Sequence, residues 1–190
     1  SENGITFAFF RSLAALNRKL QPDVAFFVTE GRPDFRLQLH EAYKGTRKQE
    51  KDENFARQRK EIIRIVKDYL PLTVVNHPNH ECDDVIAYLA TKYDNKGDEV
   101  IVVSTDTDFL QLANTLNNYS QYDPIRKSYK SLPDFDYVAW KALRGDASDN
   151  IDGFKGIGDK RAHGLLNDPL KLQQFLDVPG HKEKYNSCFL

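Results

Sequence analysis

The sequence has only two cysteines, Cys82 and Cys188, and they do not have the spacing of a metal finger. So little cysteine excludes a disulfide scaffold and predicts a reducing, cytoplasmic location. No apolar run approaches about 18 residues, so we expect no membrane-spanning helix. We also expect no signal peptide, and no serine or cysteine catalytic triad emerges from the sequence.

The chain also lacks a strong net charge. Its 27 basic residues nearly cancel its 28 acidic ones, which leaves −1, so overall charge does not indicate a nucleic-acid-binding protein. The charges are segregated, however. Between Lys44 and Lys67 there are nine Lys and Arg residues against four acids. Such a run usually marks a solvated helix face, although it is also compatible with a basic binding segment.

The 190 residues, 40% of them apolar, suffice for one ordinary domain with a small subdomain. Apolar spacing predicts helices at 5–20, 55–70 and 82–93, and strands at 24–28, 72–75 and 99–103. Alternating strands and helices predict a parallel α/β sheet. Farther along the chain we expect a hairpin around 123–124 and helices at 135–143, 159–167 and 170–176.

Acidic residues gather in three short clusters, at 81–84, 104–108 and 145–150. The first two follow predicted strands, as do Thr29 and Glu30. Because ligands of open α/β sheets bind outside the carboxyl ends of the strands, we expect these residues to meet on one edge. Crowded carboxylates need compensating cations, and hard divalent metals prefer oxygen ligands. The clusters therefore predict a divalent-metal site.

Each cluster also has a purely structural interpretation. Acids at 81–84 would satisfy the dipole of the helix that they begin. Asp106 and Asp108 could form a turn through side-chain hydrogen bonds. The third cluster runs into a glycine-rich turn at 153–158 before a helix, an arrangement that suits a phosphate. Its alternative is a pair of helices that only pack together.

In their order along the chain, these motifs resemble the 5′-nuclease family. This family comprises flap endonucleases, phage 5′-3′ exonucleases and the 5′-nuclease domain of bacterial DNA polymerases. Residues 35–47 resemble its basic segment before the helical arch, and the acidic clusters resemble its three acidic signatures. Residues 156–162 resemble its helix-hairpin-helix, which grips duplex DNA. The similarity spans roughly residues 4–185.

The resemblance implies a PIN-like α/β fold with a parallel-sheet nuclease core over residues 1–133. An arch segment at about 32–60 and a helix-hairpin-helix subdomain over 134–190 complete the expected organisation. Two departures stand out. The family's first strand, which ends in an aspartate, would precede this chain. Thr29 stands where the family usually has another aspartate, and Glu30 is the candidate substitute.

The implied activity is that of a divalent-metal-dependent 5′-3′ exonuclease or flap endonuclease. It would use two ions, Mg²⁺ or Mn²⁺, with a potassium ion at the hairpin turn. The implied metal ligands are Glu81, Asp83, Asp84, Asp106, Asp108, Asp146 and Asp149. The implied catalytic cations are Lys44, Arg36 and Arg47, and the implied DNA-binding residues are Tyr43, Lys155, Gly156, Gly158 and Lys160.

The expected partner is DNA with free 5′ ends or flaps, bound by a monomer of phage or bacterial origin. Three alternatives remain open. The chain could bind branched DNA without cutting it, or it could be a PIN-like endoribonuclease. It could also be a phosphatase with Asp106 as the nucleophile, although the other two acidic clusters would then have no purpose.

Overall fold

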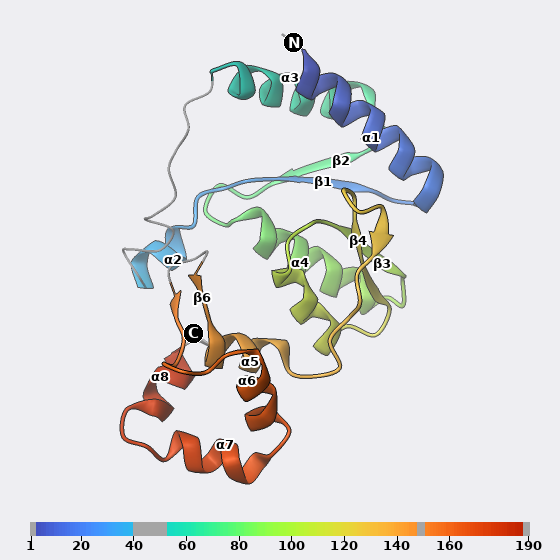
Figure 1. The fold of residues 1–190 in the computed structure, drawn as a ribbon. Helices are drawn as coiled ribbons and strands as arrows, with labels where there is room; N and C mark the ends of the chain where they lie inside the picture. The colour runs from blue at the N-terminus through green and yellow to red at the C-terminus, as the bar shows by residue number, and fades with distance from the viewer. Residues whose placement is uncertain (1–2, 40–52, 148–150, 188–190) are drawn as a thin grey trace.

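The computed structural model describes residues 3–39, 53–147 and 151–187 (Figure 1). Its first part pairs two strands, β1 (Phe26–Thr29) and β2 (Thr73–Asn76), in parallel. Helices α1 (Gly4–Leu20) and α3 (Glu53–Tyr69) pack together on one side of this pair, and α4 (Cys82–Asp94) lies on the other. The short helix α2 (Asp34–Leu39) follows β1.

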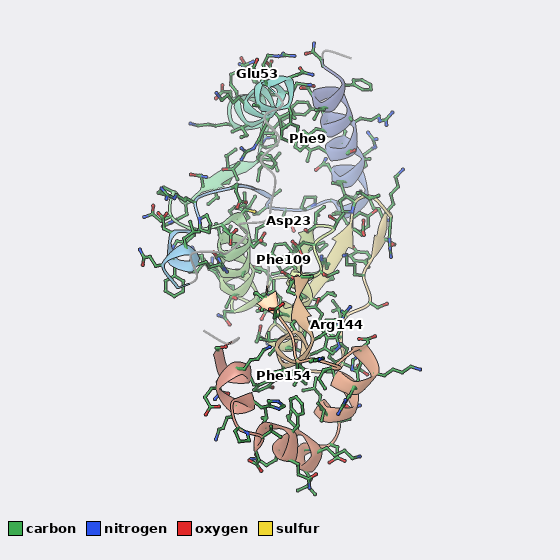
Figure 2. The ribbon with its side chains drawn as sticks, turned by 60° about the vertical axis from the view of Figure 1, so that its left-hand side comes forward. Phe9, Asp23, Glu53, Phe109, Arg144 and Phe154 are labelled. Atoms are coloured by element: carbon green, nitrogen blue, oxygen red, sulfur yellow. The ribbon has the colours of Figure 1, made fainter. Side chains whose placement is uncertain are left out.

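A second sheet contains β3 (Val100–Val103), β4 (Tyr119–Asp123) and β5 (Ser128–Tyr129). β3 and β4 run parallel, and β5 returns antiparallel to β4. The 3₁₀ helix η1 (Asp108–Asn114) connects β3 to β4. Its Phe109, near the middle of the molecule in Figure 2, packs with buried residues of α4, β3 and β4. This cluster is the core from which the acidic loop after β3 projects.

The last part is a group of helices at one end of the molecule (Figure 1). It contains α5 (Tyr137–Arg144), the hairpin of β6 (Gly145–Asp146) and β7 (Ile151–Asp152), α6 (Asp159–Leu166), α7 (Pro169–Leu176) and α8 (His181–Ser187). Leu143, Phe154, Ile157, Ala162 and Leu165 form its separate buried cluster. Phe154 marks this cluster in Figure 2.

The structure confirms the predicted helices and strands up to residue 103, with boundaries that differ by at most two residues. It also confirms the later hairpin and the three later helices. One detail differs, because the parallel strands form two separate hydrogen-bonded sheets within the described residues instead of one. Apolar patterns predict which segments are strands, whereas pairing depends on long-range backbone contacts.

Four elements were not predicted: α2, η1, the β6–β7 hairpin and α8. Each is short. The β6–β7 hairpin carries no apolar period, and η1 is a single 3₁₀ segment whose buried Phe109 and Leu112 are three residues apart. No described helix has both the length and the apolar character needed to cross a membrane.

Candidate active site

The first acidic cluster begins α4, and an arginine from α2 pairs with two of its three carboxylates. Glu81 occupies the N-cap position in extended conformation and is only 3% exposed. Arg36 donates to Asp84 through both terminal nitrogens at 2.6 Å, and to Glu81 at 3.0 Å. Its side-chain hydrogen bonds hold the pKa of Asp84 below the usual value, against the opposing effect of burial. This forked geometry makes a strong charge-assisted contact.

Glu30, Cys82 and Asp83 lie close together beyond the carboxyl end of β1. Burial raises the pKa of the Cys82 thiol, and a hydrogen bond with Glu30 raises it further. The thiol also donates to Asp83 at 3.3 Å. Because only the thiolate is a strong nucleophile, Cys82 is not poised for nucleophilic chemistry. Glu30 thus reaches the start of α4, as a substitute ligand would have to do.

Thr29 is held in a different way. Asn76, at the end of the paired strand β2, donates to its hydroxyl at 3.0 Å and to the Glu30 carbonyl at 3.1 Å. These contacts tie the carboxyl ends of β1 and β2 to each other, so the segments that follow them start from neighbouring points. Thr29 contributes no charge at this position.

The second cluster is a hydrogen-bonded turn after β3. The backbone N–H of Asp106 donates to Ser104 Oγ at 3.0 Å, and that of Asp108 donates to Asp106 Oδ1 at 2.9 Å. The turn interpretation is therefore correct for the backbone. It does not exclude metal binding, because Asp106 remains exposed and keeps lone pairs that the single N–H does not use.

One lysine connects the second and third clusters. The Lys141 ammonium, on α5, contacts Asp108 Oδ1 and lies 2.6 Å from Asp146 Oδ2. Burial lowers the pKa of Lys141, but its hydrogen bonds to the two carboxylates outweigh this effect and raise it overall. Two carboxylates from η1 and β6 therefore converge on one cation.

The glycine-rich turn between β7 and α6 is anchored by two buried side chains and by a lysine of α8. Phe154 and Ile157 are buried in the helical cluster, whereas Lys155, Gly156, Gly158 and Lys160 are exposed. Gly156 has a φ of +77°, which favours glycine. The Lys184 ammonium, on α8, donates to the Gly153 carbonyl at 2.7 Å. The turn thus presents its backbone and two lysines outward.

The structure brings together some of the predicted site residues. Arg36, which the resemblance implied as a catalytic cation, contacts Glu81 and Asp84, and Asp108 and Asp146 meet through Lys141. In the described parts of the chain, no three His, Cys, Asp or Glu side chains form a group able to hold a metal ion. Tyr43, Lys44, Arg47 and Asp149 lie outside the described residues.

Lys141 is the site residue that the sequence analysis missed. It lies with Arg144 in a helix otherwise rich in apolar residues, and a lysine five residues before the first acid of the third cluster was the available signal. Its contacts also bear on whether the residues fit a metal. Carboxylate oxygens are the donors that hard divalent ions prefer, so Asp108 and Asp146 have the right chemistry for two ligands of such an ion, at a place where Lys141 now supplies the positive charge.

The fold belongs to the class of parallel α/β proteins, and its candidate site lies beyond the carboxyl ends of the strands. A family model described as 5′-3′ exonuclease, N-terminal resolvase-like domain, matches residues 2–137. The chain belongs to this family.

Similar proteins are found among bacterial enzymes. The chain is 37% identical over 170 residues to thermostable DNA polymerase I of Thermus filiformis. The matched region covers 85% of this chain and 20% of the relative. It is 32% identical over 184 residues to a 5′-3′ exonuclease of Mycoplasmopsis pulmonis. This match covers 90% of this chain and 60% of the relative. The chain therefore spans about a fifth of the polymerase and 60% of the exonuclease.

Solved structures show the same fold. The T5 D15 protein co-crystallised with metal ions has a TM-score of 0.75 at 23% identity, over 98% of this chain and 76% of that one. The bacteriophage T5 D15 flap endonuclease in a complex with DNA and metal ions has a TM-score of 0.74 at 23% identity, over the same shares of the two chains.

Proposed function

We propose that this chain hydrolyses DNA phosphodiester bonds near free 5′ ends or flaps, with Mg²⁺ or Mn²⁺ as its metal. One observation carries the proposal: Asp108 and Asp146, from different elements, converge on the single ammonium of Lys141. Such convergence is what a bridging cation requires. Family membership and the metal-bound T5 D15 relatives support the same conclusion.

Two divalent ions would supply an activated water and stabilise the leaving oxygen. The carboxylates would hold them in two groups. Glu81, Asp83 and Asp106 would bind one ion, with Asp84 close by, and Asp108, Asp146 and Asp149 would bind the other. Glu30, which reaches Cys82, would add a carboxylate beside the first group.

The cations of the chain have distinct roles in this proposal. Arg36 orients the first group through its forked contact with Asp84 and reduces repulsion between Asp84 and Glu81. Because its guanidinium already holds both carboxylates, Arg36 would approach a phosphate only with the rest of that group. Lys44 and Arg47 would contact the scissile phosphate and its neighbours.

Duplex binding is assigned to the C-terminal helical region, with a boundary near residues 133–134. We propose that α5, α6 and the turn between them form a helix-hairpin-helix. Lys155, Gly156, Gly158 and Lys160 are exposed there and would contact backbone phosphates without reading sequence. Tyr43 would contact the 5′ strand, and a potassium ion would bind at the turn. We propose that the protein acts as a monomer.

The test is cleavage of a labelled 5′-flap duplex with Mg²⁺, with Mn²⁺ and with a chelator. Asp106→Ala should nearly abolish cutting while duplex binding, followed by anisotropy, remains. The matched control is Asp98→Ala, an exposed acid that precedes β3 instead of following it. Cutting that survives in the chelator, or equal loss of cutting and binding in Asp106→Ala, would refute the assignment.

One observation favours a second candidate, a structure-specific DNA-binding protein without nuclease activity. Thr29 is neutral and committed to Asn76 at a position where an acid was expected. Under this alternative the chain binds the flap duplex in Mg²⁺ and Mn²⁺ but cuts it in neither. The same assay therefore separates the two functions.

A further inference from the structure

Gln121, on β4, is an unusual core residue because its polar side chain is completely buried. Its exposed fraction is 0%, and it lies opposite Val102 in the β3–β4 ladder. Its amide nitrogen donates to two backbone carbonyls beyond β3, that of Ser104 at 3.0 Å and that of Asp106 at 2.5 Å. One amide group thus uses both of its N–H bonds on the acidic loop.

The contacts determine which way this amide points. The opposite orientation would place its oxygen against two carbonyl oxygens, where no hydrogen bond is possible. As it stands, the Gln121 Oε1 atom is buried and has no partner among the described residues. Unpartnered buried oxygens are unfavourable, so an apolar residue would suit the core better. The benefit of glutamine must therefore come from the two carbonyls it binds.

The loop has further constraints of the same kind. Lys130, which directly follows β5, donates to the Thr105 carbonyl at 2.6 Å. Three successive carbonyls, from Ser104 to Asp106, therefore receive side-chain donors from β4 and from the residue that follows β5. Carbonyls that leave a sheet would otherwise bond to water and leave the loop free to change shape. Here the hydrogen bonds fix the direction of the three carbonyls. The backbone positions of Asp106 and Asp108 are thereby fixed as well.

We propose that Gln121 is a positioning residue that holds the Asp106–Asp108 loop in the shape required to bind metal. This inference rests on the proposed function, because it assigns these two carboxylates to divalent ions. Removing a residue that hydrogen-bonds to a metal ligand and orients it typically weakens metal affinity about 10–100-fold. Gln121 would act on the ion through the backbone and without touching it.

The variant that isolates this role is Gln121→Met, which keeps the length of the side chain and removes both donors. Its matched control is Ser120→Ala on the same strand, because the buried Ser120 Oγ also has no partner among the described residues. We expect Gln121→Met to weaken Mn²⁺ binding, followed by electron paramagnetic resonance, by about 10-fold. Ser120→Ala should leave the binding unchanged.

Two further readouts separate positioning from a general loss of structure. Hydrogen exchange at the amides of Asp106 and Asp108 should accelerate in Gln121→Met, while exchange in α4 stays as in the wild type. In flap cleavage at fixed Mn²⁺, kcat should fall with KM for DNA unchanged, and excess Mn²⁺ should restore part of the rate. Unchanged Mn²⁺ affinity and loop exchange in Gln121→Met would overturn the proposal.

A second variant covers the case in which Gln121→Met does not fold. Lys130→Met removes the donor to the Thr105 carbonyl from the residue after β5 and should also weaken Mn²⁺ binding. Unchanged binding in this variant would then count against the proposal. The two levels of failure are distinct: a wild-type chain that binds no Mn²⁺ refutes the proposed function itself. Wild-type binding with no effect of either variant refutes only the role of Gln121.

Discussion

Lys141 Nζ lies 2.6 Å from Asp146 Oδ2, and the same ammonium contacts Asp108. The three residues come from α5, β6 and η1, so this one cation links the C-terminal helices to the core that carries the loop after β3. Because Asp108 and Asp146 would otherwise repel each other, Lys141 allows them to stay close when no metal ion compensates their charges.

Lys141→Met should destabilise the metal-free protein by about 1–2 kcal/mol, because two partly buried carboxylates lose a charged hydrogen-bond donor. Mg²⁺ should reduce this loss, since the ion would take the place of the missing charge. Urea unfolding in chelator measures the loss of stability, and urea unfolding in Mg²⁺ measures how much the ion reduces it. Lys171→Met, which removes an exposed pairing with Asp168, should cost less and show no dependence on Mg²⁺. An equal loss with and without Mg²⁺ would contradict the prediction.

Arg36→Met should raise the pKa of Asp84 toward the ordinary aspartate value of about 3.9, because the arginine now holds it lower. The stabilisation from this pair is present above the unfolded-state pKa and is lost as pH falls through the lowered folded-state pKa. The stability difference between wild type and variant should therefore shrink below about pH 4. Carboxyl NMR titration in chelator measures the shift. Arg64→Met, at an exposed pair with Glu61, should leave Asp84 unchanged.

Gly145→Ala should destabilise the helical region by about 3 kcal/mol or more, through both strain and collision. Gly145 has a φ of +80°, and an added Cβ would lie 2.1 Å from the Gly153 backbone nitrogen. This close approach places Asp146 beside the turn that leads to α6. Gly164→Ala is the control, because its Cβ would meet open space within α6. It should stabilise the protein by about 0.5–1 kcal/mol. Equal behaviour of the two variants in thermal unfolding would refute the account.

Lys160→Ala should weaken duplex binding and reduce the salt slope by about one counterion, because one phosphate contact is lost. Anisotropy titrations over a range of salt concentrations measure the slope. Lys92→Ala, in the last turn of α4, removes an exposed lysine outside the helical region and should leave the slope as it is. A slope unchanged by Lys160→Ala would remove this residue from the phosphate contacts.

Local chemistry made much of this architecture predictable. The apolar, β-branched run that ends at Val103 predicted a strand, and the acids after it could be placed at the carboxyl end of that strand. The glycine turn before α6 could likewise be predicted, because its glycines and flanking lysines lie close together in the sequence. Features that depend on neighbouring residues or on a regular period can be derived from the sequence alone.

The sequence by itself determined the order of helices and strands, the three acidic clusters and the glycine turn, because each depends on residues close together along the chain. Only the tertiary structure decided which strands share a sheet and that Arg36 pairs with Asp84 across 48 positions. It also decided that Lys141 joins Asp108 to Asp146 and that Gln121 supports the acidic loop. These contacts join elements distant in sequence, and packing determines them, not the local pattern of residues.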